Sequence, residues 1–151
     1  MEPIATISAS ELDADPSARL WALVFYLAER PEAQQLPAFR DFWLSYIYDA
    51  EVNNGGHLQY FHNQGTLAVP ATIQALESIG AASHAHLLTE CWHQVQDHPV
   101  SRVKSLNDYP ALAAERSFTA EDRAYYDQAS LLELLEVRYA QLINQAIAID
   151  A

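Results

Sequence analysis

Three side chains with metal-binding chemistry recur along one predicted helix. His86, Glu90 and His93 lie at positions i, i+4 and i+7, and Glu90 with His93 has the Glu-x-x-His spacing found in carboxylate-bridged metal bundles. Such a bundle needs a second Glu-x-x-His and two further glutamates on facing helices, and the chain has no second Glu-x-x-His. We therefore expect no metal and no cofactor. A metal-dependent enzyme that uses His86, Glu90 and His93 is kept as an alternative.

Two carboxylates and one cysteine are the other candidates for catalysis. Asp49 and Glu51 precede a glycine turn and could form an acid/base pair, but such a pair needs a cleft and two distinct environments. The C-terminal end of a helix disfavours a carboxylate, so Glu51 should be structural, with compensating bonds from nearby amide N–H groups. Cys91 is alone on a helix, where a cysteine is usually a small buried hydrophobe. We expect no catalytic residue and no enzyme.

The segment 51–65 concentrates amides, aromatics and three of the four glycines. Adjacent Gly55 and Gly56 supply positive φ where the chain must turn after a long helical pattern. The neighbouring amide side chains suit turns and caps better than catalysis: Asn53, Asn54, Gln59 and Asn63.

Apolar spacing of three and four predicts helices along most of the chain. The expected ranges are 16–29, 37–54, a short helix closed by Asn63 or Gly65, 70–80, 81–96, 119–126 and 131–147, with Gly80 as a stop. Residues 1–9 show no period, and 100–117 should be a connector. The expected fold is an all-α, single-domain orthogonal helical bundle of roughly six to eight helices, spanning 16–151 after an N-terminal lead-in over 1–15.

The first of these helices has a wide apolar stripe. Trp21 and Phe25 extend the row formed by Leu20, Leu23, Val24 and Leu27. Trp21, Trp43 and Trp92 are most simply core residues, although an exposed aromatic patch could form an oligomer interface.

Charge restricts the classes of partner. Twenty acidic residues against eight basic ones give a net charge of −12, and Lys104 is the sole lysine. Nucleic-acid binding requires cations that displace counterions, so we expect no direct nucleic-acid ligand, and a basic protein is the better match. The longest apolar run, Leu20 to Ala28, is too short to cross a bilayer, so we exclude membrane insertion. A single cysteine and no signal-peptide pattern favour the cytoplasm.

Acidic residues gather before the first helix and in the C-terminal third. On the simpler interpretation these are solvated faces and helix-start charges that aid solubility. On the functional interpretation, carboxylates on rigid helices reproduce the spacing of phosphates, about 7 Å along one strand. The candidate partner-binding surface comprises Glu11, Asp13, Asp15, Asp108, Glu115, Glu121, Asp122, Asp127, Glu133 and Glu136.

Two motifs resemble those of a bacterial DNA-mimic protein family, otherwise carried as a domain of unknown function. The first is Glu-x-x-Asn-Gly-Gly-x-x-Gln-Tyr-Phe-x-Asn, here Glu51, Asn54, Gly55, Gly56, Gln59, Tyr60, Phe61 and Asn63. The second is Ala-Leu-x-x-Ile-Gly-Ala, here Ala75, Leu76, Ile79, Gly80 and Ala81. His57 departs from the pattern, because an aromatic such as phenylalanine is expected there.

The resemblance implies an acidic, all-α, often dimeric protein whose characterised member occupies the DNA-binding surface of a transcriptional regulator. The shared motifs are architectural, so the activity depends on this chain's own carboxylates. We expect a protein-binding module that engages a transcriptional regulator or another basic DNA-binding protein. An immunity or anti-defence factor, which would block a toxin or nuclease, is the alternative among interaction proteins.

Overall fold

The computed structural model describes residues 1–99 and 117–150, so the expected connector lies outside the described residues except for Ser117. The chain forms two compact units. We call Met1–Trp43 with Leu132–Ala151 the terminal unit, and Leu44–Leu131 the central unit. The assignment of a lead-in and one domain stays a prediction.

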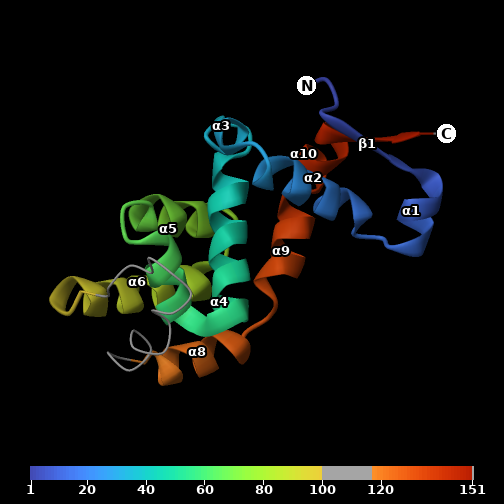
Figure 1. The fold of residues 1–151 in the computed structure, drawn as a ribbon. Coiled ribbons are helices and arrows are strands. Elements are labelled where there is room, and N and C mark those ends of the chain that lie inside the picture. Colours follow the sequence, from blue (N-terminus) through green and yellow to red (C-terminus); the bar gives the residue numbers. More distant parts are fainter. Residues whose placement is uncertain (100–116, 151) are drawn as a thin grey trace, which may run out of the picture. The chain divides into compact units, whose positions relative to one another are not determined.

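The all-α class is confirmed (Figure 1). The described residues form nine helices and one small two-stranded sheet. In chain order the elements are β1 (Ala5–Ser8), α1 (Ala9–Ala14), α2 (Ala18–Ala28), α3 (Pro31–Gln34), α4 (Arg40–Gln64), α5 (Val69–Ser78), α6 (Ala82–Asp97), α8 (Thr119–Tyr126), α9 (Leu131–Arg138), α10 (Ala140–Ala146) and β2 (Ile147–Asp150). None of these helices combines the length and hydropathy that a bilayer crossing requires.

A parallel pair of strands orders two segments to which the sequence pattern assigned no strand. β1 pairs with β2 from Ala5 opposite Ile147 to Ser8 opposite Asp150, so the two ends of the described chain lie side by side (Figure 1). Four residues are too few to show a period of two, and the partner strand comes from the other end of the chain. The sequence pattern therefore missed both strands.

Short-range polar bonds order the chain between β1 and α2. Ser8 and Glu11 form a capping box at the start of α1, with the Glu11 carboxylate accepting from the Ser8 N–H at 2.7 Å. Asp15 accepts from the N–H of Ser17 at 2.9 Å just before α2 begins. α2 thus begins at Ala18, two residues later than the predicted range, with Ser17 as its N-cap.

The last predicted helix is divided. Instead of one helix over 131–147, α9 ends at Arg138, α10 follows from Ala140, and the chain then enters β2. Tyr139 marks the break, with φ −100° and ψ 14°, and its ring packs edge-on against Phe42 at 5.4 Å. The apolar spacing continues through this point, so a contact with a distant element accompanies a break that no local signal indicates.

The buried stripe of α2 is narrower than predicted. Leu20, Leu23, Val24 and Leu27 are buried in the core of the terminal unit, whereas Trp21 is half-buried and Phe25 is 66% exposed. The prediction that Phe25 widens the core stripe is wrong, because the rest of the terminal unit covers the side of α2 that carries the leucines and leaves the side of Phe25 exposed.

Aromatic side chains fill the core of the central unit. α4 is interrupted at Gly55 and Gly56, where Gly56 has φ 75°, as the glycine turn predicts. α5 and α6 follow, with Gly80 at φ 81° between them as the expected stop. Large side chains without exposure include Tyr48, Tyr60, Phe61, Leu76, Leu88 and Phe118. The turn therefore reverses the chain within an aromatic core.

Candidate functional site: a carboxylate surface and its anchor

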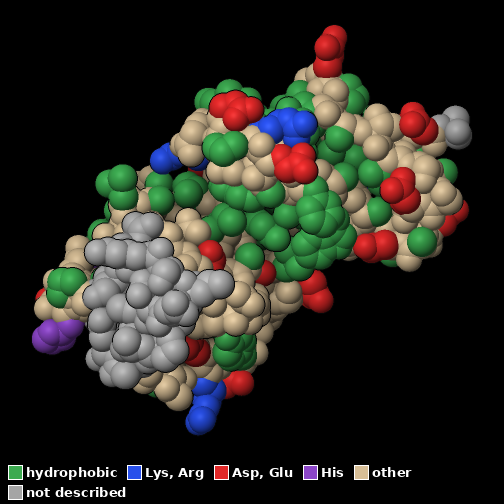
Figure 2. Space-filling view, in the orientation of Figure 1, with side chains coloured by type: hydrophobic (Ala, Val, Ile, Leu, Met, Phe, Trp, Pro, Cys, Tyr) green, Lys and Arg blue, Asp and Glu red, His purple; other side chains and the backbone are tan. Residues whose placement is uncertain are grey.

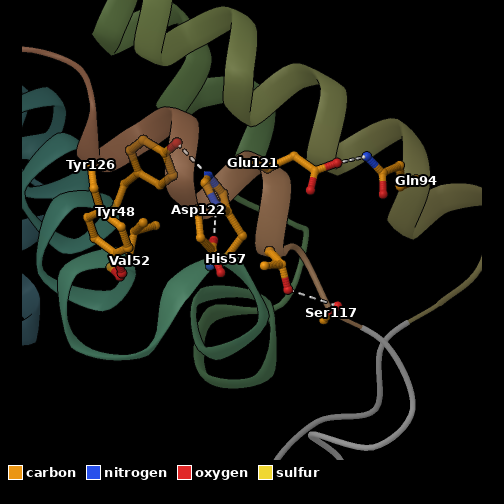
Figure 3. Close-up of polar contacts among 9 residues, drawn as sticks. Tyr48, Val52, His57, Gln94, Ser117, Glu121, Asp122 and Tyr126 are labelled. Carbon is orange, nitrogen blue, oxygen red and sulfur yellow. Dashed lines mark hydrogen bonds and ion pairs between the residues drawn. The ribbon is translucent and has the colours of Figure 1, made fainter.

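A pair of hydrogen bonds between distant segments of the central unit joins α8 to the glycine turn. Oδ1 of Asp122 accepts hydrogen bonds from the backbone N–H of His57 at 2.9 Å and from its ring Nδ1 at 2.7 Å (Figure 3). A Cβ on Gly56 would overlap the other carboxylate oxygen of Asp122. Glycine is therefore required at position 56 both for its positive φ and for the approach of this carboxylate.

His57 behaves as an aromatic core residue with polar ends. Its side chain is fully buried, and its ring contacts those of Tyr48, Tyr125 and Phe118. Nδ1 donates to Asp122, and Nε2 lies 2.9 Å from the Tyr48 hydroxyl. The histidine thus occupies the expected aromatic position and adds two hydrogen bonds there.

The Tyr48–His57–Asp122 chain has the residue types of an acid/base relay. A relay must reach a substrate, however, and neither Tyr48 nor His57 has exposed surface. Both ring nitrogens of His57 form hydrogen bonds with other side chains of the protein. These contacts therefore hold α8 against the turn.

Asp49 is a second buried carboxyl group. Tyr125 donates its hydroxyl to Asp49, and burial raises the pKa of Asp49 although this hydrogen bond opposes the shift. Burial, followed by the charge of Asp49, raises the pKa of Tyr125. The neighbouring Tyr126 hydroxyl donates to the Val52 carbonyl at 2.7 Å. Two tyrosines of α8 thus bind the last turn of α4 before the glycines.

Glu51 is structural, as its position predicts. Its carboxylate accepts from the side-chain amides of Gln59 at 2.7 Å, Asn63 at 2.9 Å and Gln64 at 3.1 Å. These are the compensating amide bonds expected for a carboxylate near a helix C-terminus. Glu51 and Asp49 make separate contacts and do not form an acid/base pair.

Of the five predicted acidic residues of the terminal unit, three lie in or directly after α1 and two lie on α9. Glu11, Asp13 and Asp15 are exposed, and Figure 2 shows acidic side chains spread over the surface around α1. The Ser17 hydroxyl donates to half-buried Glu136 at 3.0 Å, while the Ser17 N–H donates to Asp15. Carboxylates from α9 and from the start of α2 therefore meet at one serine. Glu133 is exposed on α9.

The acids of α8 are divided between structural and surface positions. Asp122 anchors the turn, and Glu121 accepts from the Gln94 amide at 2.6 Å (Figure 3). Asp127, which follows α8, is exposed. Asp108 and Glu115 lie outside the described residues. Among the acids predicted for the partner-binding surface, Asp122 thus has a structural role in the fold.

Arginine neutralises little of this charge. Among the arginines in the described part of the chain, Arg30 alone lies within ion-pair distance of a carboxylate, that of Glu29 at 3.4 Å. Acidic residues outnumber basic ones by the same margin in both units. The negative electrostatic potential of the exposed carboxylates around α1 is therefore not cancelled by nearby arginines of the described chain.

The predicted metal ligands are not gathered into a site. His86 and Glu90 contact each other at 3.3 Å on an exposed face, while His93 stacks against Trp92. His57 is engaged elsewhere, and no group of three potential ligands occurs within residues 1–99 and 117–150. Cys91 is a buried free cysteine, as expected.

Comparison with protein families matches residues 34–146 to the family described as DMP19-like protein. The chain belongs to this family. The matched range covers most of the chain and includes the glycine turn, Glu51 with its amides, and the Asp122 anchor. No curated protein and no solved structure matches the chain.

The DMP19-like match begins after α1 and α2. The acids around α1 therefore lie outside the matched range, and their role must be argued from this chain. Sequence reasoning missed the anchoring role of Asp122. The available signal was His57, a polar residue where the motif expects an aromatic. It also missed the exposed aromatic of α2, because spacing alone does not indicate which part of a wide stripe is covered.

Proposed function

We propose that this member of the DMP19-like family is a DNA mimic that occupies the DNA-binding surface of a basic protein such as a transcriptional regulator. Membership in the family suggests a DNA-mimic protein. The observation that favours it here is the exposed group Glu11, Asp13 and Asp15, none of which contacts an arginine among the described residues. The role is binding without catalysis.

The spacing of these acids suits a phosphate-binding groove. Residues four apart on a helix are separated by about 6 Å along its axis. Phosphates of one DNA strand lie about 7 Å apart. Glu11 in α1 and Asp15, the C-cap residue of α1, would stand in for two neighbours. The capping bonds of Glu11 and Asp15 restrict both side chains, which lowers the entropy lost when a partner binds.

The fields of an acidic mimic and a basic groove attract each other over distance. Association should be fast at low salt and should weaken as salt screens the charges. Double-stranded DNA should compete with this protein for the basic groove of the partner, because both ligands neutralise the same cations.

Capture from a cell lysate with matched variants tests the proposal. Glu11→Gln, Asp13→Asn and Asp15→Asn together keep side-chain shape and remove three charges around α1. Gln suits a capping box and Asn can still accept the Ser17 N–H, so the fold should persist. The control triple, Glu77→Gln, Glu90→Gln and Asp97→Asn, removes equal charge from exposed positions of the central unit.

Wild type and the control triple should capture a basic DNA-binding protein at low salt, and added double-stranded DNA should release it. The α1 triple should capture much less. Recovery of no basic protein, or equal capture by both triples, would count against a local mimic surface. A captured toxin or nuclease would favour the immunity alternative.

A further inference from the structure

α2 has a second apolar stripe beside its buried one. Ala18, Trp21, Ala22 and Phe25 lie at i, i+3, i+4 and i+7, which places them on one side of the helix. The core of the terminal unit uses the neighbouring stripe that includes Leu23 and Leu27. On this second stripe Ala18, Trp21 and Ala22 are half-buried and Phe25 is exposed, so the described residues cover it only in part.

This stripe forms one wall of a groove. Ile7 of β1 and Ala14 of α1 line the same groove, whose volume is about 570 Å³. Small alanines form a concave surface beside the large Trp21 and Phe25 rings, and Phe25 is 66% exposed. Figure 2 shows hydrophobic side chains gathered over α2. An exposed apolar patch of this kind on a helix indicates an interaction surface.

The edge of the groove is acidic. Glu11 and Asp15 are the charged residues among those that line it, and no lysine or arginine accompanies them. A second copy of the chain, docked through the same face, would bring this acidic edge into the interface twice with no lining cation to pair with it, so the two copies would repel each other there. A segment with apolar side chains between cations avoids that repulsion and pairs with both carboxylates.

We propose that this groove docks a basic amphipathic helix of the protein partner. An apolar side chain of that helix lies against Trp21 and Phe25, and flanking lysines or arginines reach Glu11 and Asp15. This is the helix-in-groove mode of recognition with an electrostatic border. The inference rests on the proposed function for the basic character of the partner, and it adds an apolar anchor to the mimic surface.

The two components of binding respond differently to salt. Attraction to Glu11 and Asp15 weakens as ionic strength rises. Burial of the Phe25 ring persists at high salt and gives a negative heat-capacity change on binding. The groove therefore predicts a salt-resistant part of the affinity that charge alone does not supply.

Three synthetic peptides separate these components by calorimetry. The first has leucines at helical spacing with lysines elsewhere. The second replaces the leucines with glutamines, and the third replaces the lysines with glutamates. Each is titrated into wild type, Phe25→Gln, Ala22→Gln and Val137→Gln. Val137 is a matched control, because it is 71% exposed in the terminal unit and does not line the groove.

The leucine–lysine peptide should bind wild type and Val137→Gln equally, and Phe25→Gln and Ala22→Gln about tenfold more weakly. The glutamine–lysine peptide should bind all four proteins alike and should release at high salt. Ala22→Gln fills the groove without removing an aromatic ring, so it keeps the test valid if Phe25→Gln fails to fold.

Several outcomes would contradict the proposed docking role of the groove. Equal binding of both lysine peptides by every variant would do so and leave the charge-based function standing, since the lysate capture tests that function separately. Equal affinity for the leucine–glutamate peptide would remove the role of Glu11 and Asp15. A change in the molar mass of Phe25→Gln by light scattering, without a change in peptide affinity, would assign the groove to a second copy.

Discussion

One oxygen of Asp122 accepts hydrogen bonds from both the backbone N–H and the ring Nδ1 of His57, which lies 65 positions earlier in the sequence. This pair joins α8 to the glycine turn across a long stretch of chain. It explains why an acidic residue that seemed suited to a partner surface is needed in the fold. Stability should therefore depend on Asp122 more than on the other acids near α8.

Asp122→Ala should lower the free energy of unfolding by about 2–3 kcal/mol, because it leaves the buried His57 N–H groups without an acceptor. Urea denaturation followed by circular dichroism measures the change. Asp127→Ala is the control, since that side chain is exposed after the same helix, and it should change stability by less than about 0.5 kcal/mol. Equal losses in both variants would contradict the anchoring role.

Gly56→Ala should be more destabilising than Gly80→Ala. Both positions have positive φ, but Gly56 is buried against Asp122 whereas Gly80 is exposed. The positive φ costs about 1–3 kcal/mol at each position, and overlap with the carboxylate adds to the cost at Gly56. A double-mutant cycle with Asp122→Ala tests the overlap. The excess cost should shrink in that background, and strict additivity would show that the carboxylate does not restrict position 56.

Glu51→Ala should lower the free energy of unfolding by about 1–3 kcal/mol, because three side-chain amides lose their shared carboxylate. Glu77→Ala on α5, at an exposed position, serves as the control. Chemical denaturation of both variants gives the comparison. A Glu51 variant as stable as the Glu77 variant would mean that these amide bonds do not contribute.

Acid should destabilise the protein partly through His84. Burial lowers the pKa of His84 below its ordinary 6.5, although a hydrogen bond with the Ala129 backbone opposes the shift. As pH falls through 6.5 the unfolded chain gains this proton before the folded chain does, so the free energy of unfolding decreases. Stability contributed by neutral His84 is therefore present above pH 6.5 and is lost toward the lower folded pKa.

His84→Phe should reduce the slope of stability against pH just below 6.5, while keeping an aromatic ring beside Tyr125. His86→Gln, on the same helix with a side chain 74% exposed, should leave the slope unchanged. Unfolding measured at a series of pH values provides the slopes. A His84→Phe slope identical to that of wild type would exclude this histidine as a source of acid sensitivity.

Local sequence signals determined much of this protein. Apolar spacing predicted α2, α4, α5 and α6, and the adjacent glycines predicted the turn within α4. The unfavourable position of Glu51 at a helix end predicted that nearby amide N–H groups would bond to its carboxylate, although the sequence did not identify which amides. These features follow from interactions between residues close in sequence, which spacing and residue type describe.

Only the tertiary structure decided which residues meet over long distances. It paired β1 with β2 and brought Asp122 into contact with His57. It packed the ring of Phe42 against Tyr139, where α9 and α10 are separated. It also left Phe25 exposed while Leu23 and Leu27 became buried, although all three belong to one apolar pattern. Periodicity gives the faces of a helix, but the packing of distant elements decides which face is covered.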